Sequence, residues 1–251
     1  MPKVSFAMTC FNKQAWVAEA IESVLSQTMK DIELVVCDDA SNDYSMDVLK
    51  HYEKIDSRVK VLSNEENMGV SFTNNKAKKA TTGEIICVAD GDDVFDPNRA
   101  KYSYDFLKKN KEFDAVYMPF FKSYWDLSKP PFELKDTEPF DGEKLKKAGG
   151  QFIGHGFMAY TRKVCDTVFY PDARKYGSDH DFILAIHNAG YKFGRIELPK
   201  KKGEIDMDKV RAGKVKVGGV YRFTDRMTSN IHREYIVNED KKLEVANATP
   251  A

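Results

Sequence analysis

Short apolar runs alternate with helix-periodic segments along the first 120 residues of the chain. The run at 32–37 is apolar apart from Glu33, as expected of a strand buried on both faces, whereas 15–27 spaces its apolar residues as on one face of a helix. The predicted strands are 4–9, 32–37, 59–62, 84–89 and 115–120. The predicted helices are 15–27, 44–52, 70–80 and 98–109. This alternation predicts parallel strands with right-handed crossovers, an α/β doubly wound sheet with helices on both faces.

The alternation ends near residue 121. Residues 122–150 contain three prolines and a Gly-Gly pair without a sustained period, and we interpret them as a long excursion of one domain, because loops of this length usually carry function. Beyond them the pattern predicts a strand from residue 154, a short helix near Val164, a helix at 179–189 and a strand at 191–198. We expect a single domain over 1–230, divided into 1–121 and a smaller half 122–230, and a tail 231–251.

The charge balance excludes one class of function. The 251 residues carry 39 Lys and Arg against 39 Asp and Glu, whereas binding nucleic acid through bulk charge needs a positive excess. The four cysteines are too widely spaced for a CxxC metal or redox motif, and as core residues they suit a reducing compartment. No apolar stretch matches a signal peptide or a membrane helix. We therefore expect a soluble, cytoplasmic protein.

Acidic residues follow two of the predicted parallel strands. Asp38-Asp39 follows the second strand and 90–93, Asp-Gly-Asp-Asp, follows the fourth. Ligands of open α/β sheets bind outside the carboxyl ends of the strands. One such cluster would fit turn or helix-cap chemistry, but several converging carboxylates repel one another unless a cation lies among them. Mg²⁺ or Mn²⁺ held by carboxylates and substrate phosphate oxygens fits this pattern, whereas neither GxxxxGK[ST] nor GxGxxG follows the first strand.

The order of these motifs resembles that of family 2 glycosyltransferases with a GT-A fold. The match is dense to about residue 110 and returns in pieces to about 230. Its segments are 4–9, Phe11-Asn12-Lys13, 20–28, 33–42, Asn67-Met68-Gly69, 83–86, and 90–93 before Pro97. The resemblance implies a Rossmann-like sheet in which 1–121 binds a nucleotide-sugar donor and 122–230 binds the acceptor.

The resemblance also implies roles for residues of the first half. Thr9 and Asp39 would hold the nucleotide base, with Asp39 accepting the N3–H of uracil. Asp90 would approach the ribose or the sugar, and Asp92 would coordinate a divalent metal, Mn²⁺ or Mg²⁺, that bridges the diphosphate. Asp93 has two interpretations, support of the metal site or a carboxylate at the start of the following helix.

The catalytic base is predicted at 178–181. Family 2 enzymes place an Asp at the start of a helix in the second half, commonly after a Glu, which Ser178 replaces here. Helical geometry puts Asp179 on the inward face with Phe182, whereas Asp181 points to the opposite side and has capping-box spacing from Ser178. Asp179 is therefore the candidate base and Asp181 a structural residue. The alternative for Asp179 is an early-turn carboxylate that stabilises the helix dipole.

Two further residues of the second half complete the candidate set. His155 lies between two glycines, which let backbone approach a ligand closely; a sugar or acceptor contact and a hydrogen-bonded structural histidine are both consistent with this. Arg222 after Tyr221 resembles an element that closes family 2 catalytic domains, and would contact a diphosphate or an anionic acceptor. The predicted donor-binding residues are Thr9, Asn12, Asp39, Asp90, His155 and Arg222.

The predicted reaction is the metal-dependent, inverting transfer of a sugar from a nucleotide-diphosphate sugar, preferably UDP-linked, to an acceptor hydroxyl on a glycan or another hydroxylated acceptor. Asp179 would take the hydroxyl proton, and the metal would neutralise charge on the departing diphosphate. The alternatives are a nucleotidyltransferase of related fold and a non-catalytic nucleotide-sugar-binding module. The residues do not indicate which sugar is transferred, and a nucleic-acid or protein acceptor stays open.

Overall fold

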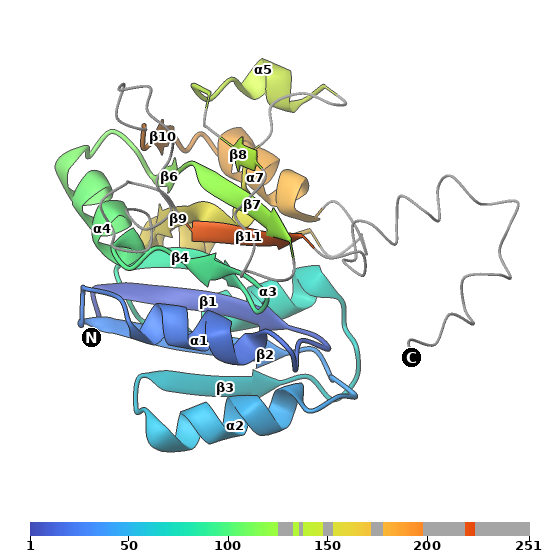
Figure 1. Ribbon diagram of the computed structural model, residues 1–251. Helices are drawn as coiled ribbons and strands as arrows, with labels where there is room; N and C mark the ends of the chain where they lie inside the picture. Colours follow the sequence, from blue (N-terminus) through green and yellow to red (C-terminus); the bar gives the residue numbers. More distant parts are fainter. Residues whose placement is uncertain (125–132, 136–137, 148–152, 172–177, 198–218, 224–251) are drawn as a thin grey trace, which may run out of the picture.

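The computed structural model contains a seven-stranded sheet between two layers of helices (Figure 1). It describes residues 1–124, 133–135, 138–147, 153–171, 178–197 and 219–223. In spatial order the strands are β10 (Phe193–Arg195), β6 (Ala115–Tyr117), β9 (Met158–Thr161), β4 (Ile85–Asp90), β1 (Val4–Cys10), β2 (Ile32–Asp38) and β3 (Val59–Ser63). Strand β9 runs antiparallel to β4 and β6, and the other neighbouring pairs of this sheet are parallel. The mostly parallel sheet is as predicted.

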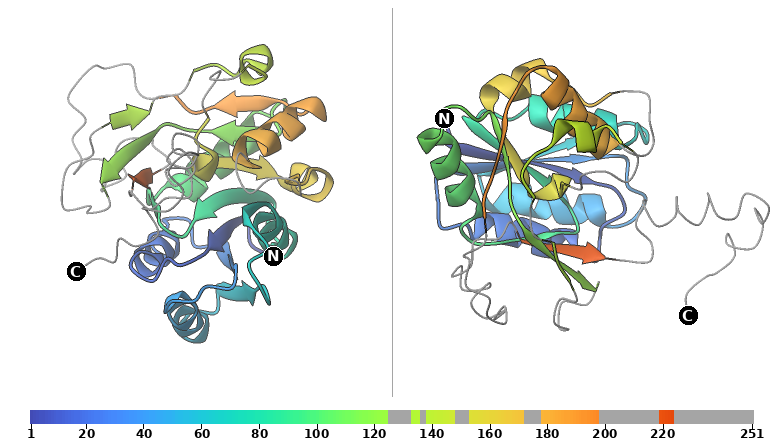
Figure 2. Two further views of the ribbon diagram at one scale, coloured as in Figure 1. Left: turned by 90° about the vertical axis from the view of Figure 1, so that its right-hand side faces the viewer. Right: turned by 90° about the horizontal axis from the view of Figure 1, so that it is seen from above.

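Helices cover both faces of this sheet, as the predicted doubly wound arrangement requires. One apolar core gathers side chains from α1 (Val17–Leu25), α2 (Ser45–Ile55) and α4 (Arg99–Lys109). The other gathers side chains from α3 (Val70–Lys79), α5 (Gly142–Leu145), α6 (Arg162–Thr167) and α7 (Ser178–Asn188). In the left view of Figure 2, the blue helices α1 and α2 lie on one side of the sheet, and the teal, yellow and orange helices α3, α6 and α7 on the other.

The central strands bury side chains on both faces, which explains their continuous apolar sequence. Along β1, Phe6 and Met8 enter the core beneath α1, whereas Ala7 enters the core beneath α3. Strand β4 divides in the same way, with Cys87 on the first side and Val88 on the second. Each large apolar side chain buried in this way contributes about 1.5–3 kcal/mol. This two-sided packing fixes the strand ends that carry the acidic residues.

A second sheet corrects the predicted strand at 115–120. The chain there forms two strands, β6 and β7 (Phe120–Tyr124), which belong to different sheets. Pro119 lies between them, and because proline has no N–H to donate to a ladder, it ends one strand before the next begins. The second sheet has the order β5 (Val94–Phe95), β11 (Gly219–Phe223), β7 and β8 (Glu133–Lys135).

The second half differs from its predicted elements at two other points. The strand expected from residue 154 begins at Met158, because a 3-10 turn, η1 (His155–Phe157), precedes it. The strand expected at 191–198 is confined to β10. Strand β11 pairs with β5 and with β7, so the chain returns to the first half after residue 218. The tail 231–251 lies outside the described residues. Within the part of the chain that is described, no helix has the length and apolarity needed to cross a bilayer.

Candidate active site

The carboxyl ends of β1, β2 and β4 lie side by side. The register pairs Thr9 of β1 with both Cys37 of β2 and Asp90 of β4, and Cys10 with Asp38. The Thr9 hydroxyl donates to Asp90 Oδ1 at 3.4 Å. The loops that follow these strands therefore meet at one edge of the sheet, as predicted from their order in the sequence.

The Asp39 carboxylate is held by donors from the next two segments of the chain. Its Oδ1 accepts from Asn64 Nδ2 at 2.7 Å and from the Met68 amide at 2.8 Å, and its Oδ2 accepts from the Gly69 amide at 2.9 Å. Gly69 precedes α3 with φ of 85°, a conformation that favours glycine. Each carboxylate oxygen has two acceptor positions, so with the donors of the described residues Oδ2 keeps one for a ligand N–H.

Asn12 joins the loop after β1 to the loop after β2. Its amide donates to Ser41 Oγ at 2.9 Å, and its side-chain oxygen accepts from the Asn42 amide at 3.0 Å. Asn12 and Ala40 both have positive φ, 52° and 58°, which is uncommon outside glycine. These bonds give Asn12 a scaffolding role in the site, and its predicted contact with a donor stays a prediction.

The acidic residues after β4 are accompanied by two cations from the first half of the chain. Lys13 Nζ lies 2.5 Å from Asp92 Oδ2, and the Asp92 side chain is only 6% exposed. Beneath the site, the fully buried Arg99 donates through Nη2 to the carbonyls of Val88 and Met158 at 2.5 and 3.2 Å, joining β4 to β9. The charge of Arg99 also acts on Asp93. A local positive charge therefore balances the carboxylates in a chain of zero net charge.

Asp90 is the point at which the two halves of the site meet. Burial raises the pKa of its carboxyl; His155 opposes this shift, and the charges of Asp179 and Asp92 add to it. Gly156 in η1 lies against the same group, because a Cβ there would stand 2.8 Å from Asp90 Oδ2. The absence of a side chain at Gly156 thus lets the η1 backbone reach the strand edge.

Asp179 and His155 come together, whereas Asp181 does not join them. The His155 Nδ1 lies 3.4 Å from Asp179 Oδ1, and the Asp179 side chain is 56% exposed at the start of α7. Phe182 is buried below it, but Asp179 itself is more exposed than Asp181, 56% against 23%, so it does not lie on the buried face of α7 that helix geometry predicted. Asp181 instead pairs with the neighbouring His180 at 3.8 Å. His155 is buried, and its Nε2 lies 2.6 Å from the Tyr170 hydroxyl.

Comparison with known proteins identifies the family. The chain matches the profile of Glycosyl transferase family 2 over residues 5–169. It belongs to this family. It is 27% identical over 203 residues to the uncharacterized glycosyltransferase MJ1057 of Methanocaldococcus jannaschii, which covers 78% of this chain and 68% of that protein.

Solved glycosyltransferases share the fold of this family 2 chain. Residues 1–349 of S. aureus TarS, in complex with UDP-GlcNAc, superpose with a TM-score of 0.65 and 16% identity over 90% of this chain and 60% of that one. The mannosyltransferase PcManGT of Pyrobaculum calidifontis, in complex with GDP-Man and Mn²⁺, gives 0.57 and 17% over 80% of this chain and 58% of that one. The fold is therefore of GT-A type, as predicted. The chain spans about three fifths of both solved chains.

The described residues contain no preformed metal cluster of three His, Cys, Asp or Glu side chains. The donor set nevertheless suits a hard cation, since Asp92 and Asp90 offer carboxylate oxygens at the strand edge and Mg²⁺ or Mn²⁺ uses one or two protein carboxylates together with substrate phosphates. Asp92 would have to exchange the Lys13 ammonium for such an ion. The side chain of Arg222 lies outside the described residues, although its backbone belongs to β11.

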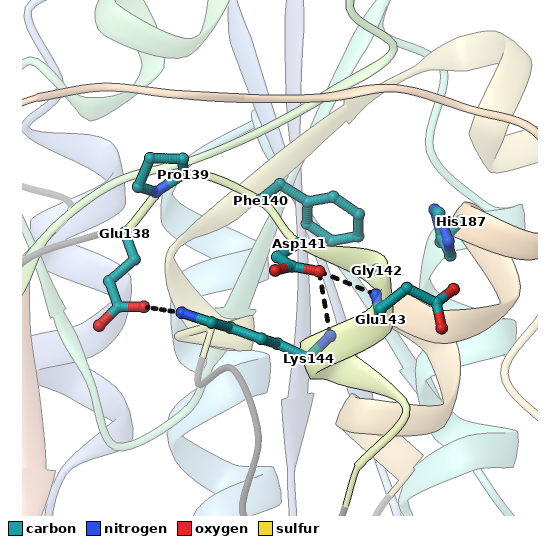
Figure 3. Close-up of a pocket in the computed structure, with 8 residues that line it drawn as sticks. All are labelled: Glu138, Pro139, Phe140, Asp141, Gly142, Glu143, Lys144 and His187. Atoms are coloured by element: carbon teal, nitrogen blue, oxygen red, sulfur yellow. Dashed lines mark hydrogen bonds and ion pairs between the residues drawn. The ribbon is translucent and has the colours of Figure 1, made fainter.

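A surface pocket of about 460 Å³ lies apart from these carboxylates (Figure 3). It is formed beside α5 and α7, where the Asp141 side chain caps α5 and Lys144 pairs with Glu138. Its lining residues are Glu138, Pro139, Phe140, Asp141, Gly142, Glu143, Lys144 and His187. Because none of the predicted donor-binding or catalytic residues lines it, we do not assign the reaction to this pocket.

The motif reasoning assigned no role to three residues of this site. Phe11 follows β1 and is 42% exposed beside the loop of Asp39. Lys13 belonged to a matching segment, but its partner could not be inferred from spacing. Tyr170 carried no signal, because a Tyr near the end of an apolar run is an ordinary core residue.

Proposed function

We propose that the protein transfers a sugar from a UDP-linked donor to an acceptor hydroxyl with inversion of configuration. The observation that carries the proposal is the convergence at Asp90: Asp39 and Asp92 reach this sheet edge from the first half, and the exposed Asp179 reaches it from the second. The complexes of TarS with UDP-GlcNAc and of PcManGT with GDP-Man support a nucleotide-sugar donor. The acceptor is a glycan or another hydroxylated molecule.

The choice of UDP rests on Asp39. Its Oδ2 keeps one acceptor position, which suits the single N3–H of uracil. Guanine presents two adjacent donors, N1–H and N2–H, and Oδ1 already takes two protein donors. A carboxylate with one free position therefore favours uracil. Thr9 and the exposed Phe11 flank the same loop and would border the base.

Asp179 would act as the general base. Its exposure at the start of α7 leaves it open to an acceptor hydroxyl, whose proton it takes as the oxygen attacks the anomeric carbon and the nucleoside diphosphate departs. Direct displacement of this kind inverts the configuration. Asp92 would hold a divalent ion, which supplies a Lewis acid for the leaving diphosphate when bound, and Asp90 would approach the ribose or the sugar. The Mn²⁺ in PcManGT supports Mn²⁺ or Mg²⁺.

We further propose that 1–230 forms one catalytic domain, with a donor half 1–121 and an acceptor half 122–230. The pairing of β11 with β7 and β5 supports the inclusion of residues up to 223. Four free and buried cysteines, Cys10, Cys37, Cys87 and Cys165, fit a reducing compartment, which we propose to be the cytoplasm.

Calorimetry with UDP and GDP, with and without Mn²⁺, tests the proposal. We expect UDP to bind more tightly than GDP and Mn²⁺ to strengthen UDP binding. Asp92→Asn should remove the Mn²⁺-dependent part, a loss of about 10–100-fold, whereas Asp105→Asn, an exposed carboxylate on α4, should not. Product configuration is read by proton NMR after a screen of UDP-sugars. Retained configuration, pyrophosphate release from a nucleoside triphosphate, or UDP binding without any turnover would contradict the proposal.

A further inference from the structure

Side chains from three separate segments form a series of contacts, Tyr170–His155–Asp179, in which the first two are buried and Asp179 is exposed. Tyr170 Oη lies 2.6 Å from His155 Nε2, and His155 Nδ1 lies 3.4 Å from Asp179 Oδ1. His155 comes from η1, Tyr170 from the segment after α6, and Asp179 from the first turn of α7. The His155 side chain is 4% exposed, so its two nitrogens face protein groups rather than solvent.

The two neighbours of the His155 ring favour one tautomer. The Asp179 carboxylate, which can only accept, faces Nδ1, whereas the Tyr170 hydroxyl, which can donate, faces Nε2. In a neutral imidazole, both contacts are hydrogen bonds only when Tyr170 donates to Nε2. A neutral imidazole whose Nε2 accepts must carry its proton on Nδ1. That N–H then points toward the Asp179 carboxylate, the orientation in which it stabilises a charged base.

The surroundings of Tyr170 keep this arrangement rigid. Its ring stacks on Phe182 with centroids 3.8 Å apart and planes 9° apart, and the His155 ring meets the Tyr170 ring edge-on at 87°. The Asn75 side chain of α3 accepts from the Tyr170 amide and donates to the Tyr170 carbonyl, both at 2.9 Å. Tyr170 is therefore held rigidly by its neighbours, whereas the exposed Asp179 carboxylate at the other end of this series of contacts is free to move.

We propose that Tyr170 and His155 are positioning residues that hold the Asp179 carboxylate, through the Nδ1–H of His155, in the orientation and charge state of a general base. The proposal rests on the proposed role of Asp179. At 3.4 Å the contact is longer than an ordinary hydrogen bond, and a small rotation of the exposed carboxylate closes it, as is common when substrate completes a site. Ser178 Oγ, 3.3 Å from the same oxygen, provides a second donor.

Other ionisable groups lie near the same residues. Asp90 faces His155 from β4. The pKa of Tyr170 is raised mainly by burial and then by Tyr160, and Asp179 and Asp90 raise it further. The titratable groups around Tyr170, His155 and Asp179 are Asp90, Asp92, Lys13, Tyr160 and Cys165. The Asp90 and Asp179 carboxylates repel each other, and an N–H on the His155 nitrogen that faces Asp179 offsets this repulsion.

Tyr170→Phe tests the proposal with the least disturbance. It keeps the stacked ring but frees His155 to carry its proton on Nε2, which turns a lone pair toward Asp179. We expect kcat to fall about tenfold, as for a lost charge-assisted hydrogen bond, with the donor KM within about twofold. The acid limb of the kcat profile should move to higher pH, because a carboxylate that loses a donor becomes easier to protonate.

Tyr160→Phe is the matched control. Tyr160 is also fully buried and also packs against Phe182, with centroids 5.6 Å apart, but its hydroxyl has no hydrogen-bond partner among the described residues. Its loss should leave kcat and the pH profile unchanged.

Asparagine and glutamine at position 155 add a second comparison: Asn places an amide N–H near the position of Nδ1, whereas Gln places it near Nε2. His155→Asn should therefore retain more activity than His155→Gln.

The outcomes separate this inference from the proposed function. If Asp179→Asn abolishes transfer while Tyr170→Phe matches Tyr160→Phe in kcat and pH profile, Tyr170 and His155 do not position Asp179, although Asp179 is the base. If Asp179→Asn retains transfer, the proposed base itself is wrong. Imidazole ¹⁵N spectra of the chain's five histidines, with His155→Asn for assignment, report the tautomer independently of activity. A proton on Nε2 in the wild-type protein would overturn the proposal.

Discussion

At the scale of single residues, Lys13 shows how the site tolerates its own charge. Its ammonium pairs with Asp92 at 2.5 Å and lies 5.7 Å from the centre of the Trp16 ring. Burial lowers the pKa of Lys13, but the charges of Asp92, Asp90 and Asp93 outweigh this and raise it overall. Lys13 is thus a built-in counter-ion for the carboxylate that we propose as a metal ligand, and ion and ammonium compete for one oxygen.

Replacing Lys13 by Met tests this competition. Without metal, Lys13→Met should destabilise the fold by about 2–3 kcal/mol, somewhat below the 3–5 kcal/mol typical of a fully buried pair that loses one partner. Added Mn²⁺ should raise the melting temperature of the variant more than that of the wild type, because the ion no longer competes with an ammonium. Thermal unfolding with and without Mn²⁺ measures both effects.

Lys101→Met is the control for this comparison, since Lys101 pairs with Asp105 on the exposed surface of α4. It should respond to Mn²⁺ as the wild type does. An equal Mn²⁺ shift in Lys13→Met and wild type would show that Lys13 and the ion do not share Asp92.

At the scale of elements, α3 joins the two halves of the site through buried polar side chains. Lys78 is fully buried and donates through Nζ to the carbonyls of Cys165 and Val168, at 2.5 and 2.7 Å. One turn earlier, Asn75 holds Tyr170. Both contacts fix the end of α6 and the segment that follows it, so α3 sets the position of Tyr170, and of its contact with His155, relative to the sheet. The pattern of apolar residues predicted α3 as a helix but gave no reason to expect these long-range bonds.

The buried Lys78 should make stability depend on pH. Burial lowers its pKa to about 8, from a usual value of 10.5. Between these values the unfolded chain binds the proton and the folded chain does not, so the folded state gains stability as pH rises through this window. In Lys78→Met this gain is absent. The free energy of unfolding of wild type relative to the variant should therefore increase by about 3 kcal/mol from pH 7 to pH 10.5.

Chemical denaturation across this pH range measures the difference. The neighbouring Lys79 is exposed, and Lys79→Met should give a curve that parallels the wild type. A parallel curve for Lys78→Met as well would mean that Lys78 stays charged in the folded protein.

At the scale of the whole molecule, the site is assembled from segments far apart in the sequence. Strand order and acidic motifs predicted that Asp39, Asp90 and Asp92 meet at one sheet edge, because parallel strands align their carboxyl ends. Helix geometry singled out Asp179 over Asp181 for the same physical reason, a fixed angle per residue. The strand register confirms that the first three residues follow strand ends at one sheet edge, because the regular period of an element determines direction. The roles of all these residues stay predictions.

The remaining features depend on packing between distant segments, which no local period encodes. The break at Pro119 sends β7 into a second sheet, where it meets β11 almost 100 residues later. Among the described residues, Lys13 and Arg99 supply positive charge at the carboxylates, and neither could be recognised as such from motif spacing. The pairing of His155 with Tyr170 likewise required the folded chain.

Whether Asp179 takes the proton of the acceptor is tested most directly by one pair of variants. Asp179→Asn and Asp181→Asn remove equivalent charges two residues apart on α7. Once a UDP-sugar and an acceptor that support turnover are found, we predict that Asp179→Asn lowers kcat by about 10²–10⁴-fold while Asp181→Asn stays within about twofold, with UDP affinity in Mn²⁺ preserved in both. An Asp179→Asn enzyme that keeps more than half of the wild-type kcat would contradict the account.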